Sequence, residues 1–313
     1  MKRSEKLTVI GCGTMGHSIV LNAAWAGLPV TMYGLNAEET TTGLAGIMAK
    51  LDVLVNGELI KQAEIPSIMQ RITTSYTLNE AVSNTSFIIE AIPENLQLKQ
   101  ELFKSLENVC GADVVFASNT SGLVPSQIAE GLVHSERFIV LHFWNPAHLV
   151  PLVEVVGAAN TSDVTRQRSI DLLQQMRKKP VVVKKEIMGF IGNRLQAALL
   201  REALHLLEQC VASKEDIDAA VTYSIGRRLP VTGPLASADM GGLDVFAAIS
   251  DYLFKDLSNA SEAPQILKNL VAENRLGQKT KQGFYPWDNE FTESMNRKRE
   301  LALIGFLKQD QQA

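Results

Sequence analysis

The sequence predicts an α/β protein with a doubly wound, mainly parallel sheet in its first half and an all-helical domain in its second half. Three observations lead to this prediction. Short apolar runs alternate with helical segments as far as residue 185, a glycine-rich turn follows the first apolar run, and the pattern from Gly189 onward is helical. Alternation of strands and helices is typical of a parallel sheet that is covered on both faces.

The chain has 313 residues, of which 46% are hydrophobic, so it is long enough for two packed domains. We place a boundary near Lys185, where the pattern changes, and predict domains at residues 1–185 and 186–313. Residues 36–71 have a mostly helical pattern and interrupt the alternation. They therefore indicate a helical hairpin that is inserted between two strands.

Each apolar run of the first half fits a buried strand, because it is short and is bounded by turn-forming or polar residues. These runs span residues 7–11, 29–34, 86–92, 113–119, 137–143 and 149–156. Helical periodicity is clearest at residues 14–27 and 93–110, and again after Gly189. In the second half, Ser213 followed by Asp216 has the residue types of a helix N-cap.

Composition argues against several classes of function. Charged residues make up 20% of the chain and the net charge is −4, which favours neither a disordered protein nor a nucleic-acid binder. Cys12, Cys110 and Cys210 are scattered and odd in number, so we expect no disulfide framework and no metal site. A reduced, cytoplasmic setting fits best. No membrane span is expected, because no stretch approaches the roughly 18 apolar residues of a membrane helix.

A glycine-rich turn, Gly11-x-Gly13-x-x-Gly16, lies between the first predicted strand and the first predicted helix. The first glycine permits a tight turn, the second lets the backbone approach a pyrophosphate, and the third lets helix and strand pack closely. Free N–H groups at the helix start, at Thr14 and Met15, then face the phosphates. We therefore predict a Rossmann-type site for NAD. The alternative is an ordinary glycine-rich turn.

The second predicted strand departs from the dinucleotide-binding pattern. About 20 residues after the glycines, that pattern has an Asp or Glu that bonds the adenine-ribose hydroxyls, but this chain has Gly34. No Arg lies between Gly34 and Thr42 to accept a 2′-phosphate, so NAD is favoured over NADP. Asn36, Glu38 and Glu39 are each candidates to replace the missing acid.

The segment Leu141–Val156, LHFWNPAHLVPLVEVV, carries a histidine and a glutamate within apolar runs. It fits a strand, an Asn-Pro turn and a returning strand, with His142 and Glu154 equally far from the centre of the turn. Opposed residues on antiparallel strands have Cβ atoms about 5 Å apart, so the carboxylate is expected to bond one imidazole nitrogen and fix the tautomer. This is the arrangement of a general base that is held by an orienting acid.

Two further polar residues are candidates to complete the site. Ser121 follows the predicted strand at 113–119, at the edge where open parallel sheets place ligands. Asn193 lies near the start of the first helix after the boundary, and either caps that helix or reaches into a cleft. For Ser121 the alternative is a turn or a helix cap. For His142 and Glu154 the alternative is a hydrogen-bonded core histidine beside an edge-strand glutamate.

At these residues the chain resembles the 3-hydroxyacyl-CoA dehydrogenase family, and the resemblance covers nearly its whole length. The matching segments occur in family order and are GCGTMG, EAIPENLQLKQELF, SNTSGL, HFWNPAHLVPLVEVV, GFIGNRL and RLGQKTKQGFY. The resemblance implies an NAD-binding Rossmann domain, a helical dimerisation domain and therefore a homodimer. It also implies oxidation of a small-molecule substrate, a 3-hydroxyacyl-CoA, to the 3-oxoacyl-CoA.

The resemblance also implies roles for single residues. It makes His142 the base that removes the 3-hydroxyl proton while hydride leaves C3 for the nicotinamide, and it makes Glu154 the residue that orients His142. Ser121 and Asn193 would bond the substrate oxygens. The cofactor contacts implied by the same match are Glu94, Lys99 and Asn119.

Three residues depart from the family pattern. Gly34 replaces the ribose-binding acid, Lys281 stands where the C-terminal motif usually has glycine, and Pro151 stands where acyl-CoA members usually have lysine. The PLVEV form is closer to relatives that oxidise CoA-free substrates, such as gulonate, carnitine and pyridine-carboxylate alcohol dehydrogenases. The substrate is thus either an acyl-CoA or a free 3-hydroxy acid or related alcohol.

Further alternatives follow from the same pattern. In the family, residues 36–71 would clamp CoA, and here they carry Lys50, Lys61 and Arg71, which match no individual phosphate ligand. Hydroxyisobutyrate and phosphogluconate dehydrogenases use a lysine on the first interdomain helix, but GNRLQAALLREA has none. A non-catalytic nucleotide-binding protein is the remaining alternative, although such a protein has no need of the polar residues at 121, 142, 154 and 193.

Overall fold

The computed structural model of the protein describes residues 5–312 and divides into two compact units. The first unit contains the residues up to Asn193 together with those from Arg297 onward, and the second unit spans Arg194–Asn296. This division differs from the predicted boundary near Lys185 in two ways. The first unit extends slightly further, and it also takes in the end of the chain.

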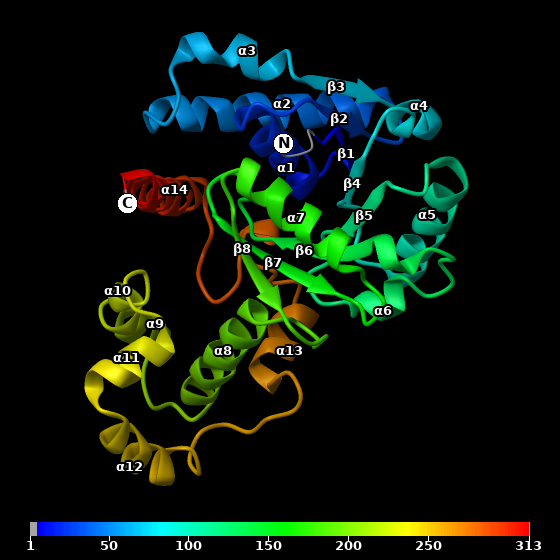
Figure 1. The fold of residues 1–313 in the computed structure, drawn as a ribbon. Coiled ribbons are helices and arrows are strands. Elements are labelled where there is room, and N and C mark those ends of the chain that lie inside the picture. The colour runs from blue at the N-terminus through cyan, green and yellow to red at the C-terminus, as the bar shows by residue number, and fades with distance from the viewer. Residues whose placement is uncertain (1–4, 313) are drawn as a thin grey trace. The chain divides into compact units, whose positions relative to one another are not determined.

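The first unit contains one sheet, which has eight strands within the described residues (Figure 1). The strand order is β3-β2-β1-β4-β5-β6-β7-β8, and every pair is parallel except β6 with β7. The strands are β1 (Leu7–Ile10), β2 (Val30–Tyr33), β3 (Ile72–Ser75), β4 (Phe87–Glu90), β5 (Val115–Ser118), β6 (Phe138–Phe143), β7 (Leu152–Gly157) and β8 (Lys179–Val183).

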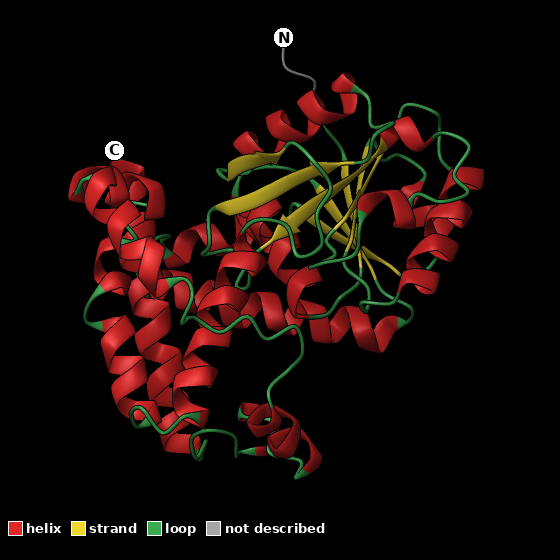
Figure 2. Ribbon diagram, turned by 90° about the horizontal axis from the view of Figure 1, so that it is seen from below, coloured by secondary structure: helices red, strands yellow, loops and turns green. Residues whose placement is uncertain are grey.

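Helices cover both faces of this sheet (Figure 2). The helices that pack on one face are α1 (Thr14–Trp25), α2 (Ala37–Asn56), α3 (Ile65–Met69) and α7 (Asp163–Gln175). The helices on the other face are α4 (Leu78–Val82), α5 (Leu96–Val109) and α6 (Pro125–Ile128). Neighbouring strand residues point to opposite faces, so Ile88 and Ile89 enter different cores. The predicted α/β class is confirmed.

Two strands of the sheet were not predicted from the sequence. β3, with sequence ITTS, is short, largely polar and lies at one edge of the sheet, so it lacks the apolar run of a buried strand. β8, with sequence KPVVV, lies at the other edge and is half-exposed. Edge strands bury only part of their surface, and this weakens the pattern by which strands are recognised.

The order of the strands reverses beside β1, because β2 lies on one side of β1 and β4 on the other. Open α/β sheets bind ligands in the crevice outside the carboxyl ends of the strands at such a point. The glycine-rich turn follows β1, and the segment that contains Ser121 follows β5. Both therefore lie at the same edge of the sheet.

The second unit is helical, as predicted. It contains most of α8 (Gly192–Glu208), followed by α9 (Lys214–Thr222), α10 (Ile225–Arg228), α11 (Pro234–Gly241), α12 (Leu243–Leu253) and α13 (Gln265–Ala272). Short 3₁₀ turns occur at Gln62–Glu64 and Ser135–Arg137 in the first unit and at Gln278–Thr280 in the second. The predicted N-cap is confirmed, because the Ser213 side chain accepts a hydrogen bond from the Asp216 backbone N–H at the start of α9.

Helix α14 (Asn289–Gln312) returns the chain to the first unit from Arg297 onward. Ile304 is buried in the core that lies under α1 and α2, where Leu303 and Leu307 pack against it. The Lys308 ammonium is 3.1 Å from a carboxylate oxygen of Glu58, just beyond the end of α2. The first unit is thus assembled from two separate stretches of the chain.

Candidate active site

The three glycines of the first turn have different structural roles. Gly11 has φ +116°, and a Cβ atom at this position would lie 2.6 Å from the carbonyl oxygen of Ala91. A Cβ atom at Gly16 would lie only 1.9 Å from the carbonyl oxygen of Gly11, so a side chain there would force α1 away from the turn. A Cβ atom at Gly13 would meet nothing within 4 Å. The backbone at Gly13 is therefore open to a ligand.

A cleft of about 960 Å³ lies beside this turn. The turn lines it through Gly11, Gly13, Thr14 and Met15, and the end of β2 lines it through Gly34 and the residues that follow. The fit to a dinucleotide is good, since an exposed backbone at the start of a 12-residue helix faces a cleft of that size. Gly16 lies behind the turn and supports it by permitting close packing.

His142 and Glu154 are paired across β6 and β7 in the predicted register. The imidazole Nδ1 lies 2.8 Å from Glu154 Oε2, and both side chains are buried, with exposed fractions of 6% and 1%. A carboxylate can only accept, so Nδ1 carries the proton in this bond. The other ring nitrogen, Nε2, is then the acceptor in the neutral imidazole.

The second oxygen of Glu154 is held by the backbone. Oε1 accepts hydrogen bonds from the N–H groups of Ile191 and Gly192, at 2.8 and 3.0 Å. Burial alone would raise the pKa of Glu154, but the hydrogen bonds from His142, Gly192 and Ile191 outweigh burial and lower the pKa. Glu154 is therefore an ionised, fixed carboxylate within the sheet.

Two aromatic rings flank the imidazole. The ring centroids of Trp144 and Phe190 lie 5.4 and 5.6 Å from that of His142. Phe190 is fully buried although its φ is +51°, a left-handed value that is uncommon for residues other than glycine. The strained residue lies directly before the two N–H groups that bind Glu154, so the backbone conformation at Phe190 orients those donors.

Asn193 joins this pair to the end of β5. Its side-chain Nδ2 donates to the carbonyl oxygen of Ser121 at 2.7 Å. Because Asn193 follows Gly192 directly, it connects Ser121 with the backbone that holds Glu154. The four predicted catalytic residues therefore belong to two sets of hydrogen bonds that the peptide link between Gly192 and Asn193 joins. Ser121 is exposed.

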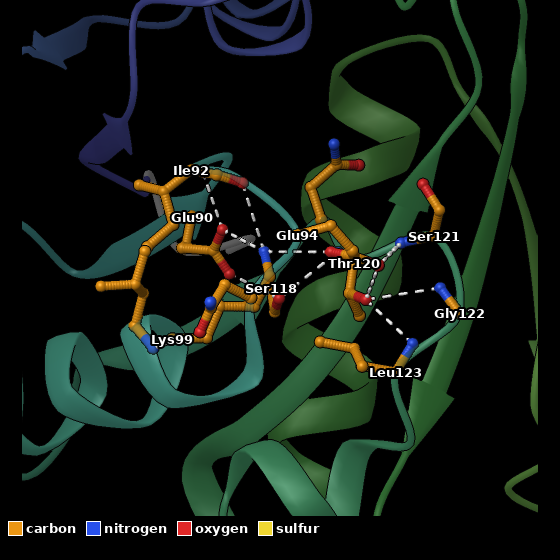
Figure 3. A network of polar contacts seen from close by, with 12 residues as sticks. Glu90, Ile92, Glu94, Lys99, Ser118, Thr120, Ser121, Gly122 and Leu123 are labelled. Carbon is orange, nitrogen blue, oxygen red and sulfur yellow. Dashed lines mark hydrogen bonds and ion pairs between the residues drawn. The ribbon is translucent and has the colours of Figure 1, made fainter. Parts of the chain in front are cut away.

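A second network of polar contacts supports the segment around Ser121 (Figure 3). Glu94 Oε1 accepts from the Thr120 hydroxyl at 2.5 Å and from the Ser121 backbone N–H at 2.9 Å. The Thr120 hydroxyl oxygen also accepts from the N–H groups of Gly122 and Leu123. In this structure Glu94 holds the turn that carries Ser121, and its direct contact with the cofactor stays a prediction.

Lys99 lies in the same network and is almost fully buried. Its ammonium donates to Glu90 Oε1 at 2.6 Å, and Glu94 Oε2 lies 3.4 Å away (Figure 3). Glu90 also accepts from Ser118 and from the Ile92 backbone N–H. Lys99 therefore pairs with protein carboxylates, and a contact with the cofactor stays a prediction for this residue as well.

Asn119 is the remaining predicted cofactor contact, and it is nearly buried. Its Oδ1 accepts from the Phe143 backbone N–H at 2.8 Å, next to His142. The Asn119 side chain thereby links the carboxyl ends of β5 and β6, which positions Ser121 and His142 relative to each other.

Comparison with protein-family models covers nearly the whole chain. The model described as 3-hydroxyacyl-CoA dehydrogenase, NAD binding domain, matches residues 6–187, and the one described as 3-hydroxyacyl-CoA dehydrogenase, C-terminal domain, matches residues 189–287. The chain belongs to the 3-hydroxyacyl-CoA dehydrogenase family. It is an NAD-dependent oxidoreductase, and the Rossmann-type cofactor site predicted at the glycine-rich turn agrees with the first match.

Individual relatives differ in their substrates. The chain is 33% identical over 304 residues to the 5-formyl-3-hydroxy-2-methylpyridine 4-carboxylate 5-dehydrogenase of Mesorhizobium japonicum, with 96% of each chain covered. It is 37% identical over 287 residues to a 3-hydroxybutyryl-CoA dehydrogenase of Clostridioides difficile, with 90% of this chain and 99% of that protein covered. The crystal structure of an NAD⁺-dependent dismutase named as the same pyridine carboxylate dehydrogenase superposes with a TM-score of 0.89 at 29% identity, covering 97% of each chain.

Some residues of this dehydrogenase site were not singled out from the sequence. Glu90, Trp144 and Phe190 all contact predicted site residues in the structure. Glu90 had a usable signal, because a carboxylate at the end of the apolar strand FIIE needs a partner, as Glu154 does. Trp144 and Phe190 had none, since an aromatic residue near a strand or helix is usually part of the core.

Residues 5–312 contain no group of three or more His, Cys, Asp or Glu side chains arranged to hold a metal ion. Among these residues there is also no helix with the length and apolar content needed to cross a bilayer.

Proposed function

We propose that this dehydrogenase oxidises a small, CoA-free, carboxylate-bearing alcohol, or reduces the corresponding carbonyl compound, with His142 as general base and acid. The pairing of His142 with Glu154 carries the catalytic part of the proposal. The small number of available cations in the helical insertion carries the substrate part. Bound NAD⁺ supplies the acceptor for the hydride that leaves the carbinol carbon.

The chemistry proposed for His142 follows from its hydrogen bond. With Nδ1 donating to Glu154, the lone pair of Nε2 is available to take a hydroxyl proton. The proton converts the ring to imidazolium, and the ionised Glu154 carboxylate stabilises that charge at 2.8 Å. In the reverse direction the imidazolium returns the proton to a carbonyl oxygen. Such general acid–base catalysis typically contributes about 10²–10⁴ in rate.

Ser121 and Asn193 are proposed to orient the substrate oxygens. The Ser121 hydroxyl lies on an exposed turn whose backbone is held by Glu94 and Asn193, so its position is fixed while its O–H can rotate. The remaining N–H of the Asn193 amide is a second donor. Donors that are fixed before the reaction stabilise charge that develops on oxygen without a cost of reorganisation.

The helical insertion at residues 36–71 offers little to a CoA phosphate. The Lys50 ammonium is half-buried and lies 2.9 Å from His17 Nε2, and burial lowers its pKa. Arg71 donates to the carbonyl oxygen of Ala24. Two of the three cations in the insertion are therefore directed toward the protein.

Helix α14 is shared with some relatives more fully than with others, and this does not separate the two substrate classes, because a 3-hydroxyacyl-CoA dehydrogenase structure from Archaeoglobus fulgidus covers 97% of this chain. The helix lies beyond residue 287, where the family match ends, and it packs Ile304 against Gly57 at the end of α2. α14 has 24 residues, which is more than the 96% match to the pyridine carboxylate relative leaves out. That relative therefore shares at least part of it. The 3-hydroxybutyryl-CoA relative is matched over 99% of its length while covering only 90% of this chain.

The decisive experiment compares substrates in a nicotinamide absorbance assay with NAD⁺. It would include hydroxymethyl- and formyl-pyridine carboxylates, gulonate, carnitine, free 3-hydroxybutyrate and 3-hydroxybutyryl-CoA. We expect turnover with a CoA-free compound and a kcat/KM for the CoA ester that is at least 100-fold lower. A higher kcat/KM with the CoA ester would overturn the substrate assignment but would leave the role of His142 to its own test.

Oxidation of a 3-hydroxyacyl-CoA is the second candidate. Both family matches and the 37% identity to a 3-hydroxybutyryl-CoA dehydrogenase favour it. Pro151 separates the two candidates, because acyl-CoA members usually have lysine there. If Pro151→Lys raises activity on 3-hydroxybutyryl-CoA while activity on the CoA-free substrate falls, position 151 determines specificity. If neither activity changes, the residue is irrelevant to the choice.

A homodimer is proposed on the basis of the second unit. Helices α11 and α12 contain no buried residue when one chain is considered alone. Their exposed side chains include Leu235, Met240, Leu243, Phe246 and Tyr252. Exposed apolar side chains in this number on two neighbouring helices are typical of an interface between subunits.

A further inference from the structure

Position 34 lacks the room that an acidic side chain would need. A Cβ atom built on Gly34 would lie 2.7 Å from Cys12 Sγ, 3.1 Å from Thr40 Cγ2 and 3.2 Å from Glu39 Cβ. Gly34 directly follows β2, whose last residue, Tyr33, accepts a hydrogen bond from the backbone N–H of Gly11. Neighbouring side chains therefore occupy the space that an acidic side chain at position 34 would need.

Cys12 is the nearest of these neighbours. It lies between the first two glycines of the turn, and its side chain is buried against the end of β2. Burial and the nearby Glu39 carboxylate raise the pKa of the Cys12 thiol to about 11, so the thiol is neutral. A neutral sulfur can occupy the space beside a carboxylate without the repulsion that a second acid would bring.

Glu39 approaches the same point from α2. Its Oε2 accepts from the backbone N–H of Leu35 at 2.9 Å, so the carboxylate is folded back over the loop after β2. The backbone N–H of Glu39 donates to Asn36 Oδ1, which caps the helix. Among residues 5–312, Glu39 Oε1 has no hydrogen-bond partner, and Glu39 lines the dinucleotide cleft.

The two other polar residues of this segment are less suitable. Glu38 also lines the cleft, but it is exposed and makes no hydrogen bond to the loop after β2 within residues 5–312. Asn36 uses its side-chain oxygen to cap α2, and an amide lacks the charge that makes a carboxylate a strong acceptor for hydroxyl groups. Glu39 combines a carboxylate that is held in place by the Leu35 N–H with a position next to Gly34 in the lining of the cleft.

We propose that Glu39 binds the adenine-ribose hydroxyls of NAD in place of the missing acid at position 34. The acid reaches the ribose from the first turn of α2, and Cys12 fills the position that the strand-end acid would occupy. Glu39 also sets the preference for NAD, because its charge would repel the 2′-phosphate of NADP. The inference concerns only the cofactor, so it does not depend on whether the substrate carries CoA.

The test is a titration of the protein with NADH and with NADPH, followed by fluorescence and without substrate. Glu39→Gln is the informative variant, because a glutamine oxygen can still accept from the Leu35 N–H while the charge is lost. We expect its Kd for NADH to rise about 10-fold or more, since hydrogen bonds to a charged group are involved. We also expect the ratio of the NADPH and NADH dissociation constants to shrink. Glu38→Gln is the matched control and should bind NADH like the wild type.

Two results would overturn this role of Glu39. One is an unchanged NADH affinity in Glu39→Gln, which would mean that the carboxylate only supports the loop. The other is an equal loss in Glu39→Gln and Glu38→Gln, which would indicate a general effect of charge. Thermal melting of each variant, measured in parallel, verifies that a change in affinity does not come from unfolding.

A rescue experiment tests the replacement itself. Gly34→Asp alone should weaken NADH binding, because its Cβ atom meets Cys12 Sγ. In the triple variant Gly34→Asp/Cys12→Ala/Glu39→Ala the sulfur is removed and an acid stands at the strand end. We expect this variant to bind NADH more tightly than Cys12→Ala/Glu39→Ala. No recovery in a folded triple variant would contradict the claim that the two positions serve the same role.

Discussion

Nδ1 of His142 and Oε2 of Glu154 lie 2.8 Å apart across an antiparallel strand pair whose other members are buried apolar residues. The strand pair fixes the distance, and the backbone N–H groups of Ile191 and Gly192 fix the carboxylate from the other side. Rotation of the Glu154 side chain would break its hydrogen bonds to His142 and to both backbone N–H groups. The tautomer of the histidine is therefore set before any substrate arrives.

The first prediction concerns His142. Replacing it by alanine should lower kcat about 10²–10⁴-fold, because the group that takes the hydroxyl proton is lost. NADH affinity should remain within about twofold of the wild type, since His142 does not line the cofactor cleft. Steady-state kinetics and a fluorescence titration measure the two quantities on the same sample. Equal losses of turnover and cofactor binding would count against its role as base.

The second prediction concerns Glu154. In Glu154→Gln the amide oxygen is needed by the N–H groups of Ile191 and Gly192, so the amide NH₂ faces Nδ1. The imidazole would then have to present its lone pair to that NH₂ group and its N–H to the substrate. We expect kcat to fall at least 100-fold, and the double variant with His142→Ala to be no slower than His142→Ala alone. That non-additivity is typical of residues that act as a unit. Additive losses would show that Glu154 acts independently of His142.

The third prediction concerns His148, which is buried and accepts or donates a hydrogen bond with the Ser18 hydroxyl at 3.0 Å. Burial, with the nearby charges of Lys50, Lys178 and His17, lowers its pKa to about 3, whereas the unfolded chain has the ordinary value of 6.5. Between pH 6.5 and about pH 3, His148 therefore binds a proton in the unfolded state but not in the folded state. The free energy of unfolding should fall with acid, by up to about 1.4 kcal/mol per pH unit from this group.

Urea unfolding between pH 7 and pH 4 measures this dependence. His148→Asn keeps a polar atom near Ser18 and removes the titrating ring, so its stability should fall less steeply over the same range. The control is His134→Asn, at a side chain that is half-exposed. Parallel curves for wild type and His148→Asn would show that His148 is not the group responsible.

The fourth prediction concerns Lys281, which has φ +60° in the left-handed region that favours glycine. The family usually has glycine at this point of the C-terminal motif, and the backbone conformation supplies the reason. Lys281→Gly should raise the free energy of unfolding by about 0.5–1 kcal/mol. Lys281→Ala keeps a Cβ atom and should give no such gain. If both variants behave alike in chemical denaturation, relief of backbone strain is not the cause.

The fifth prediction concerns assembly. The wild type should sediment at about twice the 34.3 kDa of one chain, as expected for a homodimer. Leu243→Glu places a charge on the exposed apolar face of α12 and should shift the protein toward the monomer. Val164→Glu, at an exposed apolar residue of α7 in the first unit, is the control and should not. A wild type that sediments as a monomer would refute the homodimer.

Much of this arrangement could be predicted from the sequence because it depends on local patterns. The opposition of His142 and Glu154 follows from equal spacing on either side of a turn, and the role of Gly13 follows from its position between a strand and a helix. The competition between Cys12, Gly34 and Glu39 for one space could not be predicted. It depends on three segments that meet only through the parallel pairing of β1 and β2 and the packing of α2.

The packing of α14 against the first unit also could not be predicted from the sequence. α14 has the composition of an exposed helix, and only Ile304 and its apolar neighbours reveal where it packs. Their partners lie about 250 residues earlier in the chain, as the pairing of Lys308 with Glu58 shows. Contacts over such a separation leave no periodic signal in either segment. β3 and β8 lie at the edges of the sheet and are partly exposed, so their sequences lack the full apolar run of a buried strand.

Because α14 returns to the first unit, the helical unit is connected to that unit at both of its ends. The chain leaves the nucleotide-binding unit at Asn193 and re-enters it at Arg297. The helical unit is therefore inserted into the nucleotide-binding unit and is joined to it by two peptide connections. Severing one connection would leave the other intact, and α14 would still be held by Ile304 and Lys308. A protein built in this way keeps its two halves together after a single break in the backbone.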